Sequence, residues 1–229
     1  MRIYTKYAKN DNEIINDFNV LENRNSSPKE YSEALYNIGI KLSKHIRNYV
    51  SFTDNVVFSC TNEDADYLGK AFIENLKQKS NIRLAIFWNY RTQAFGDKDL
   101  TIAPIVKQYI EQIEECDTLI ICKSIIYTSC VVRTNLTYLI NKINPKKIII
   151  VAPVIYDKAE EFLNKEFDPQ ISSKFKYLYF AKDNEVNAQG EVIPGIGGNI
   201  YNRLGFKDGE DKNKYIPNIV KVRREKNYG

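Results

Sequence analysis

Short, mostly apolar runs constrain the fold of this chain most, because they alternate with segments whose apolar residues have helical spacing. A run of this length is typical of a strand buried on both faces, as in a parallel sheet. Strands that alternate with helices favour an α/β fold, here a single domain with a mainly parallel sheet flanked by helices. The chain of 229 residues is long enough for one such domain. The predicted strands span residues 55–60, 82–88, 119–122, 148–153 and 175–181.

The predicted helices follow from start signals and from apolar spacing. Ser27 and Pro28, with Glu30 three residues after Ser27, form a capping-box pattern. The apolar residues from Leu35 to Val50 then lie on one helical face. A polar loop is predicted at residues 89–99. The other predicted helices lie at residues 65–76, 103–113, 131–140 and 158–165.

Composition limits the function classes. The net charge of +4 is too small to indicate a nucleic-acid-binding protein by itself. No apolar run has the length of a membrane span, and the first residues lack the apolar core of a signal peptide. We therefore predict a soluble, cytoplasmic protein with no membrane partner. The four cysteines lack the spacing of a zinc site and are predicted to be free thiols of the core.

The C-terminal end differs from the rest of the chain. Residues 1–206 are predicted to form the domain, and residues 207–229 a basic tail. The cluster from Lys221 to Lys226 is able to meet the phosphates of a nucleic acid, whereas a solvated tail is the simpler interpretation.

Three loops are expected to meet at one edge of the predicted sheet. They comprise residues 61–64, 90–99 and 123–130, and each follows a predicted strand. Ligands of open α/β sheets bind beyond the carboxyl ends of the strands. Glu63, Asp64 and Asp66 in the first loop are more typical of a helix start than of a metal site, so no metal ligands are predicted.

Several motifs occur in an order that resembles the uracil phosphoribosyltransferase family, from about residue 27 to residue 206. Asn89-Tyr90-Arg91, followed by residues 100–106 (LTIAPIV), is similar to the family segments G-I-Y-R-D and T-L-E-P-V. Residues 190–198 (GEVIPGIGG) look like G-Y-I-V-P-G-L-G-D, and residues 202–205 (NRLG) look like the following D-R-L-F-G. The resemblance implies the type I phosphoribosyltransferase fold, with a small C-terminal hood.

The resemblance also implies an activity and a set of site residues. Such enzymes transfer a phosphoribosyl group from phosphoribosyl pyrophosphate (PRPP) to N1 of uracil, with Mg²⁺ on the diphosphate. Catalysis would depend on positioning and on charge stabilisation of the leaving group. By this resemblance Arg91 is the catalytic candidate, Thr61 and Asn62 belong to the diphosphate loop, the phosphate loop contributes Lys123, Ser124, Thr128 and Ser129, and the base-binding main chain lies at Ile193, Pro194, Gly195 and Gly197.

The loops depart from the family pattern while the apolar scaffold agrees with it. The family phosphate loop reads D-P-M-L-A-T-G-G-S, but here Lys123 replaces the aspartate, Ser129 and Cys130 replace the glycines, and Thr128 matches. The family diphosphate loop reads P-I-L-R-A-G, but in this chain the arginine is missing and the loop ends in carboxylates. Carboxylates repel a diphosphate. The chain is therefore interpreted as a degenerate member of the family.

Three hypotheses follow. The first is a catalytically degenerate protein that binds a nucleotide or nucleobase ligand and acts as a regulatory or partner-docking subunit. The second is an active, divergent transferase that uses Arg91, Thr128 and Mg²⁺. The third is a nucleic-acid-binding accessory protein that uses the basic tail. The resemblance also makes a homo-oligomer the expected state.

Overall fold

A computed structural model describes residues 1–76, 81–94 and 97–228 of the chain. Within these residues, eight strands form one sheet in the order β1-β10-β9-β7-β2-β3-β6, with β8 beside β9. The strands are β1 (Arg2–Tyr4), β2 (Asn55–Thr61), β3 (Asn81–Asn89), β6 (Ile105–Ile110), β7 (Thr118–Cys122), β8 (Ile125–Ile126), β9 (Lys147–Tyr156) and β10 (Phe175–Asp183).

The centre of the sheet is parallel, as the apolar runs predict. β10, β9, β7, β2 and β3 pair in parallel, whereas β1 and β6 run antiparallel at the two edges. Neighbouring residues of one strand pack on opposite faces: Phe58 belongs to one apolar cluster and Val57 to the other. Both faces are thus covered, which explains why these strands are apolar along their whole length.

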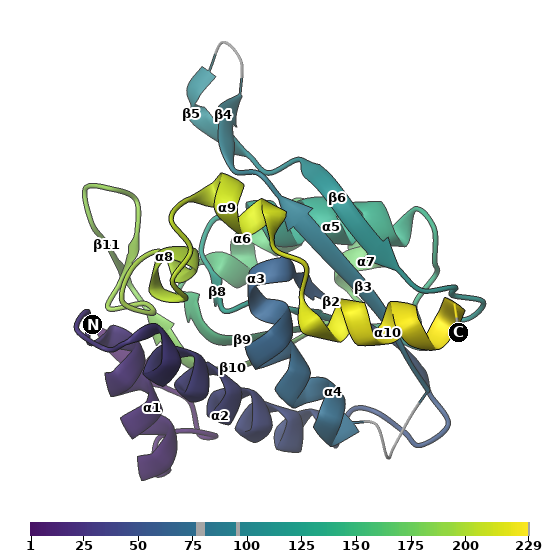
Figure 1. Cartoon of the computed structure of the whole chain (residues 1–229), viewed down its shortest axis with the longest axis horizontal. Coiled ribbons are helices and arrows are strands. Elements are labelled where there is room, and N and C mark those ends of the chain that lie inside the picture. The colour runs from purple at the N-terminus through teal and green to yellow at the C-terminus, as the bar shows by residue number, and fades with distance from the viewer. Residues whose placement is uncertain (77–80, 95–96, 229) are drawn as a thin grey trace.

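Helices form a layer on each face of the sheet (Figure 1). The capping box at Ser27 begins α2 as predicted, with the Glu30 backbone N–H donating to Ser27 Oγ. The apolar cluster on one face draws on α1 (Asn12–Glu22), α2 (Pro28–Ile46), η1 (Ala65–Gly69) and α4 (Lys70–Leu76). The cluster on the other face draws on α5 (Cys130–Ile140), α6 (Ala159–Lys165) and, at its margin, α7 (Pro169–Ser172).

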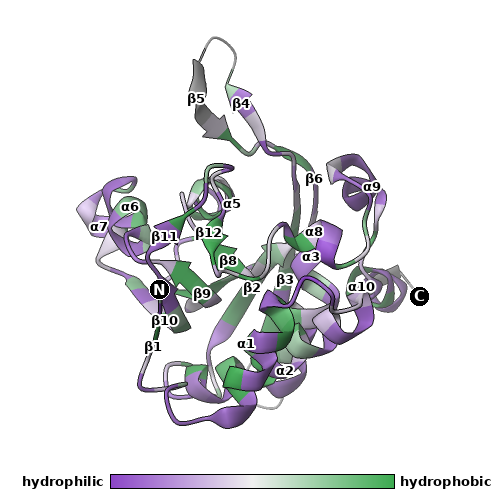
Figure 2. Ribbon diagram, turned by 90° about the vertical axis from the view of Figure 1, so that its left-hand side faces the viewer, coloured by the Kyte–Doolittle hydropathy of each residue, from purple (hydrophilic) through white to green (hydrophobic). Residues whose placement is uncertain are grey.

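The predicted helix at residues 103–113 is wrong, because this segment contains the edge strand β6. Ile105, Val106, Tyr109 and Ile110 are residue types that fit a strand, and antiparallel hydrogen bonding to β3 decides between the two structures. The polar loop predicted at residues 89–99 is replaced in part by a hairpin of β4 (Thr92–Ala94) and β5 (Asp97–Ile102). Figure 2 shows this hairpin extending away from the sheet.

The segment after Phe206 is folded against the rest of the molecule, in contrast to a solvated tail. It forms α9 (Gly209–Lys214) and α10 (Asn218–Tyr228), and α10 lies beside η1 and β3 (Figure 1). The side chains of Lys212 and Val220 are buried. The indole N–H of Trp88 donates to the carbonyl oxygen of Tyr215 at 2.8 Å. This segment therefore contributes to the core and to the cavity described below.

The four cysteines are free and buried, as predicted. Among the described residues, no helix combines the length and the apolar character that crossing a membrane requires.

Candidate functional site

A cavity of about 740 Å³ lies at the carboxyl ends of the central strands. Its wall is formed by the turn after β2, the end of β3 with the β4–β5 hairpin, the loop between β7 and α5, residues 189–201 and α9. These include the three loops that the sequence predicts to converge. The volume falls within the range of ordinary small-molecule sites. Of the predicted site residues, those on the wall are Arg91, Lys123, Thr128 and Ser129.

The loop between β7 and α5 keeps an unusual backbone conformation. Ser129, the residue before α5, has φ of 61° and ψ of 1°, in the left-handed region that favours glycine. The resemblance places a family glycine at this position. Thr128 is exposed, whereas the hydroxyl of Ser129 donates to the Ala159 carbonyl oxygen at 3.3 Å. Thr128 is therefore the most exposed of the serine and threonine residues in this loop.

Lys123 is engaged in an internal ion pair. Its Nζ lies 2.6 Å from Asp64 Oδ2 and 3.3 Å from Glu63 Oε1, and only 8% of the residue is exposed. Thr61 Oγ1 donates to the same Asp64 oxygen at 2.8 Å, and the backbone N–H of Ser124 lies 3.4 Å from it. The residue at the position of the family aspartate is therefore bound to the carboxylates of the predicted diphosphate loop.

A second lysine closes this cluster from the C-terminal segment. Lys212 Nζ donates to the Asn89 carbonyl oxygen at 2.8 Å and lies 3.5 Å from Glu63 Oε2. Asn62 Nδ2 donates in return to the Lys212 carbonyl oxygen at 2.7 Å. α3 (Asn62–Asp64), β7 and α9 are joined in this way by four buried charged side chains.

The pKa values of the cluster follow from burial and from the ion pairs. Burial alone would raise the pKa of Glu63, but the charges of Lys123 and Lys212 together with hydrogen bonds from its own backbone N–H and from Thr61 outweigh burial, and the pKa is lowered. Burial alone would lower the pKa of Lys123, but Asp64 and Glu63 outweigh it, and the pKa is raised. Both groups are consequently charged at neutral pH.

Of the other predicted residues, Thr61, Asn62 and Ser124 hydrogen-bond to members of this cluster. Arg91 is exposed on the cavity wall after β3. Thr61, Asn62 and Ser124 are buried behind the wall. Next to Arg91, the side-chain amides of Asn89 and Asn135 donate to each other's oxygens at 2.8 and 3.0 Å, which fixes the end of β3 to α5.

The predicted base-binding segment uses its main-chain groups internally. The N–H of Gly195 donates to Asp183 Oδ2 at 2.8 Å, and its carbonyl oxygen accepts from Arg2 Nη2 at 2.5 Å. Gly197 has positive φ, and a Cβ there would lie 2.2 Å from the Leu21 carbonyl oxygen. Gly197 is therefore required by backbone geometry. Ile193, Pro194, Gly195 and Gly197 do not reach the cavity wall.

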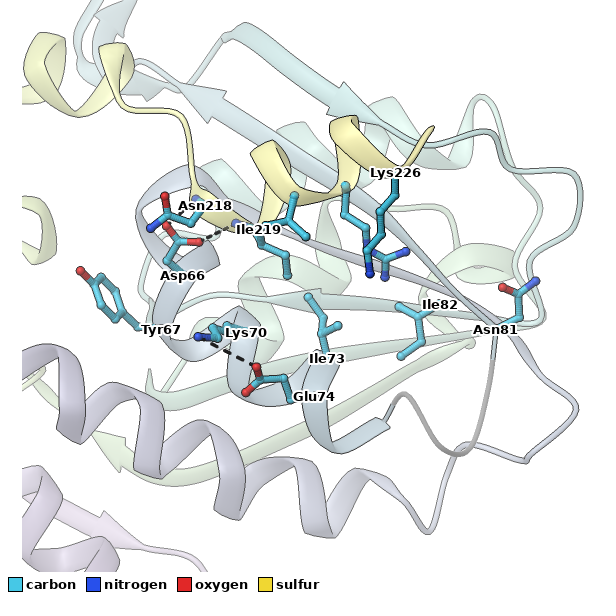
Figure 3. A pocket seen from close by; sticks show the side chains of 12 residues that line it. Asp66, Tyr67, Lys70, Ile73, Glu74, Asn81, Ile82, Asn218, Ile219 and Lys226 are labelled. Atoms are coloured by element: carbon cyan, nitrogen blue, oxygen red, sulfur yellow. Dashed lines mark hydrogen bonds and ion pairs between the residues drawn. The ribbon is translucent and has the colours of Figure 1, made fainter. Parts of the chain in front are cut away.

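A separate cavity of about 620 Å³ lies beneath α10, bordered by η1, α4 and β3. Figure 3 shows apolar side chains such as Ile73 and Ile82 beside charged ones such as Lys70, Glu74 and Lys226. Asp66 lies at one end of this cavity, where its carboxylate accepts the backbone N–H groups of Asn218 and Ile219 at 2.7 and 3.0 Å. Asp66 is therefore the cap of α10.

Residues of the C-terminal segment were missing from the predicted site. Lys212 lies in a polar stretch, GEDKNK, which gives no sign that its side chain is buried. Nor does it indicate a contact with Asn62, which lies 150 residues earlier in the chain. The family pattern identifies the carboxylates of Glu63 and Asp64 as a departure but does not identify their lysine partners. The sequence does contain one indication of an ion pair: Lys123 stands at the position of a family aspartate, and Asp64 lies in the loop where the family has an arginine.

The site does not fit Mg²⁺. Glu63 and Asp64, the carboxylates nearest the expected diphosphate position, are paired with lysines, whose positive charge opposes a divalent cation. In the described part of the chain, no group of three or more His, Cys, Asp or Glu side chains is arranged to hold a metal.

No protein-family model matches the sequence, and no curated protein matches it. The AQ2163 protein from Aquifex aeolicus is structurally similar, with a TM-score of 0.66 and 15% identity over 86% of this chain and 96% of that one. Similar structures also include a hypoxanthine-guanine phosphoribosyltransferase from Bacillus anthracis (TM-score 0.42, 13% identity, 56% and 72% covered). A third is a Neisseria gonorrhoeae protein with bound ppGpp (TM-score 0.45, 11% identity, 67% and 82% covered).

At 15% identity, the similarity to the Aquifex aeolicus protein shows a shared fold. The fold in question is a single α/β domain with a mainly parallel central sheet flanked by helices.

Proposed function

We propose that this chain is a phosphoribosyltransferase-fold protein that binds a nucleotide or nucleobase in the cavity at the carboxyl ends of the strands and does not transfer a phosphoribosyl group. The observation that carries the proposal is the buried ion pair between Lys123 and Asp64, with 2.6 Å between Nζ and Oδ2. The family resemblance assigns Lys123 to the position of a carboxylate that holds the ribose hydroxyls. An ammonium group already paired with a carboxylate does not replace that function.

Electrostatics at the diphosphate position supports loss of transfer. Transfer requires that the charge developing on the leaving diphosphate be stabilised by cations or preorganised donors. Here Glu63 lies on the cavity wall with Asp64 buried behind it, and their charges are balanced by Lys123 and Lys212. A diphosphate would meet a cluster with no net positive charge.

Features that support ligand binding are retained. The cavity volume of about 740 Å³ accommodates a nucleotide. Tyr90, Tyr127 and Tyr201 lie on its wall and offer aromatic surface to a base, and Arg91 with the Thr128 hydroxyl offers donors to a phosphate. In this proposal the ligand acts as a signal, and the protein is a regulatory or partner-docking subunit.

The test is conversion of labelled uracil to uridine monophosphate with PRPP and Mg²⁺ at high protein concentration, together with calorimetric titration of uracil and uridine monophosphate. We expect binding of a ligand without product. Product that disappears in the Arg91→Ala variant would overturn the loss of transfer. Absence of binding by both ligands in folded protein would overturn the binding function.

An active, divergent transferase is the second candidate, because Arg91, Thr128 and Ser129 do lie on one cavity wall. This candidate requires Mg²⁺ on the diphosphate of PRPP, held without the carboxylates of the lysine cluster. It predicts turnover that is abolished by Arg91→Ala.

Nucleic-acid binding through the C-terminal basic residues is the third candidate. In α10, Arg223 lies 3.6 Å from Glu111, and the Arg224 guanidinium lies over the Tyr109 ring at 5.5 Å. Lys221 and Lys226 are exposed. This candidate predicts binding that falls steeply with salt and with substitution of these lysines.

Homo-oligomerisation, which the family resemblance favours, remains part of the proposal. Its measurement is the molar mass in solution by light scattering.

A further inference from the structure

We infer that Lys123 and Lys212 form an oxyanion-binding site at the floor of the cavity, and that the carboxylate of Glu63 occupies this site in place of an external anion. The ligand class is a compact oxyanion, such as inorganic phosphate or the phosphate of a phosphomonoester. The inference rests on the proposed function, since it concerns how a phosphorylated ligand gains access to the same cavity.

The geometry of Glu63 is that of a bridging anion. Its Oε1 lies 3.3 Å from Lys123 Nζ, and its Oε2 lies 3.5 Å from Lys212 Nζ. Glu63 is 7% exposed and lies on the cavity wall. Among the described residues, its Oε2 has no hydrogen-bond partner, so the carboxylate spans the two ammonium groups at the longer end of ion-pair distances.

Asp64 makes shorter contacts than Glu63 through one oxygen, Oδ2, whereas its Oδ1, like Glu63 Oε2, has no hydrogen-bond partner among the described residues. Its Oδ2 accepts from Lys123 Nζ at 2.6 Å and from Thr61 Oγ1 at 2.8 Å, and the residue is fully buried. Asp64 therefore balances one lysine permanently. Glu63 balances the other, and it is the carboxylate that an incoming anion is able to replace.

The charge count gives the direction of the effect. Asp64 and Glu63 contribute two negative charges, and Lys123 and Lys212 two positive ones, so the buried cluster is neutral. Without the charge of Glu63, the cluster carries one excess positive charge in surroundings of low polarity. Such a charge is costly unless an anion neutralises it.

A phosphate suits the two lysines for chemical reasons. Its several oxygens accept from two ammonium groups at once, and charge-assisted hydrogen bonds of this kind are stronger than neutral ones. Asp208, which caps α9, and Glu210 of α9 also lie on the cavity wall and add negative charge there. While Glu63 remains in place, these carboxylates disfavour anion entry.

The test compares Glu63→Gln with the wild type by titration with inorganic phosphate, at an ionic strength kept constant with chloride. We expect Glu63→Gln to bind phosphate at least about tenfold more tightly, because the removed carboxylate competes for the same lysines at close range. The matched control is Glu191→Gln, the same chemical change on another wall of the cavity, where the carboxylate accepts from Asn187. This control should bind phosphate as the wild type does.

The double variant Glu63→Gln with Lys212→Met restores a neutral cluster and should lose the gained affinity. Equal affinity of Glu63→Gln and the wild type, or a gain that persists in the double variant, would overturn the inference. Glu63→Asp keeps the charge and shortens the side chain by one methylene, so it tests the same displacement if Glu63→Gln fails to fold. We expect it to gain phosphate affinity to an intermediate degree, and no gain would count against the inference.

Failure of this inference is distinguishable from failure of the proposed function. Nucleotide binding by the wild type without any gain in Glu63→Gln would leave the proposed function standing. A gain in phosphate affinity in Glu63→Gln, together with phosphoribosyl transfer by the wild type, would support the inference and overturn the proposed function.

Discussion

Lys123 joins two loops of the candidate site through its charge. It directly follows β7 and lies on the cavity wall, and its ammonium group pairs with Asp64 and Glu63 in the neighbouring loop. Both partners are buried, so the pair must satisfy its own charges. Breaking a buried ion pair by removing one partner is more costly than losing an exposed one, because the remaining charge has no solvent.

We expect Lys123→Met to lower the free energy of unfolding at neutral pH by about 3–5 kcal/mol, since it leaves two buried carboxylates with one lysine. The control Lys165→Met removes an exposed lysine that pairs with Glu161 at 2.6 Å and should cost less than about 0.5 kcal/mol. Urea unfolding measures both. A cost for Lys123→Met no larger than that of the control would contradict the role of the buried pair.

The loss of stability in Lys123→Met should depend on pH. The folded-state pKa of Glu63 is lowered, so its contribution to stability is complete above the ordinary glutamate pKa of about 4.3 and is lost as the pH falls through the lower folded value. In Lys123→Met the buried carboxylates gain stability when they become protonated. The difference in stability between wild type and variant should therefore narrow from pH 7 toward pH 4, and a constant difference would argue against this explanation.

At the scale of secondary-structure elements, the C-terminal helix α10 depends on a residue of η1. Asp66 accepts the N–H groups of Asn218 and Ile219 (Figure 3). Its carboxylate also accepts from the Tyr215 hydroxyl. Asp66 follows Glu63 and Asp64 by two or three residues. One short segment thus joins the lysine cluster to the helix that covers β3.

We expect Asp66→Ala to destabilise the start of α10 by about 1–2 kcal/mol, because two backbone N–H groups and a hydroxyl lose their acceptor. Trypsin cleavage between Lys221 and Lys226 should become faster, as measured by mass spectrometry under native conditions. Ser27→Ala is the matched control, since it removes the cap of α2 at the other side of the molecule. Equal acceleration in both variants would show a global effect and would contradict the local role of Asp66.

At the scale of the whole molecule, the basic C-terminal segment packs against the domain and is not separate from it, although its composition indicates a tail. Lys212 reaches the cluster at the carboxyl ends of the strands, Tyr215 accepts from Trp88, and Val220 is buried in the core. Residues 207–228 are therefore bound to the sheet by charge, by hydrogen bonds and by apolar contact. Whether residues 1–206 form an independent domain therefore depends on how stable they are without this segment.

We expect a chain ending at Phe206 to lose at least about 3 kcal/mol of stability, because Glu63 loses a counter-ion and the apolar surface beneath α10 becomes exposed. Thermal and urea unfolding of the two chains measure this loss. A full chain with Lys212→Met separates the contribution of the ion pair from that of the apolar contact. A truncated chain as stable as the full one would establish residues 1–206 as an independent domain.

Local sequence patterns are enough to predict the parallel sheet, the capping box of α2 and the meeting of three loops at the carboxyl ends of the strands. Local patterns carry this information, since burial on both faces requires apolar runs and a helix start requires particular residues. The tertiary structure alone decided that residues 105–110 form an edge strand, that Gly195 uses its polar groups on Asp183 and Arg2, and that Lys212 meets Glu63. These outcomes depend on which distant segments come into contact, and hydrogen bonding and charge neutralisation at those contacts leave no periodic pattern in the chain.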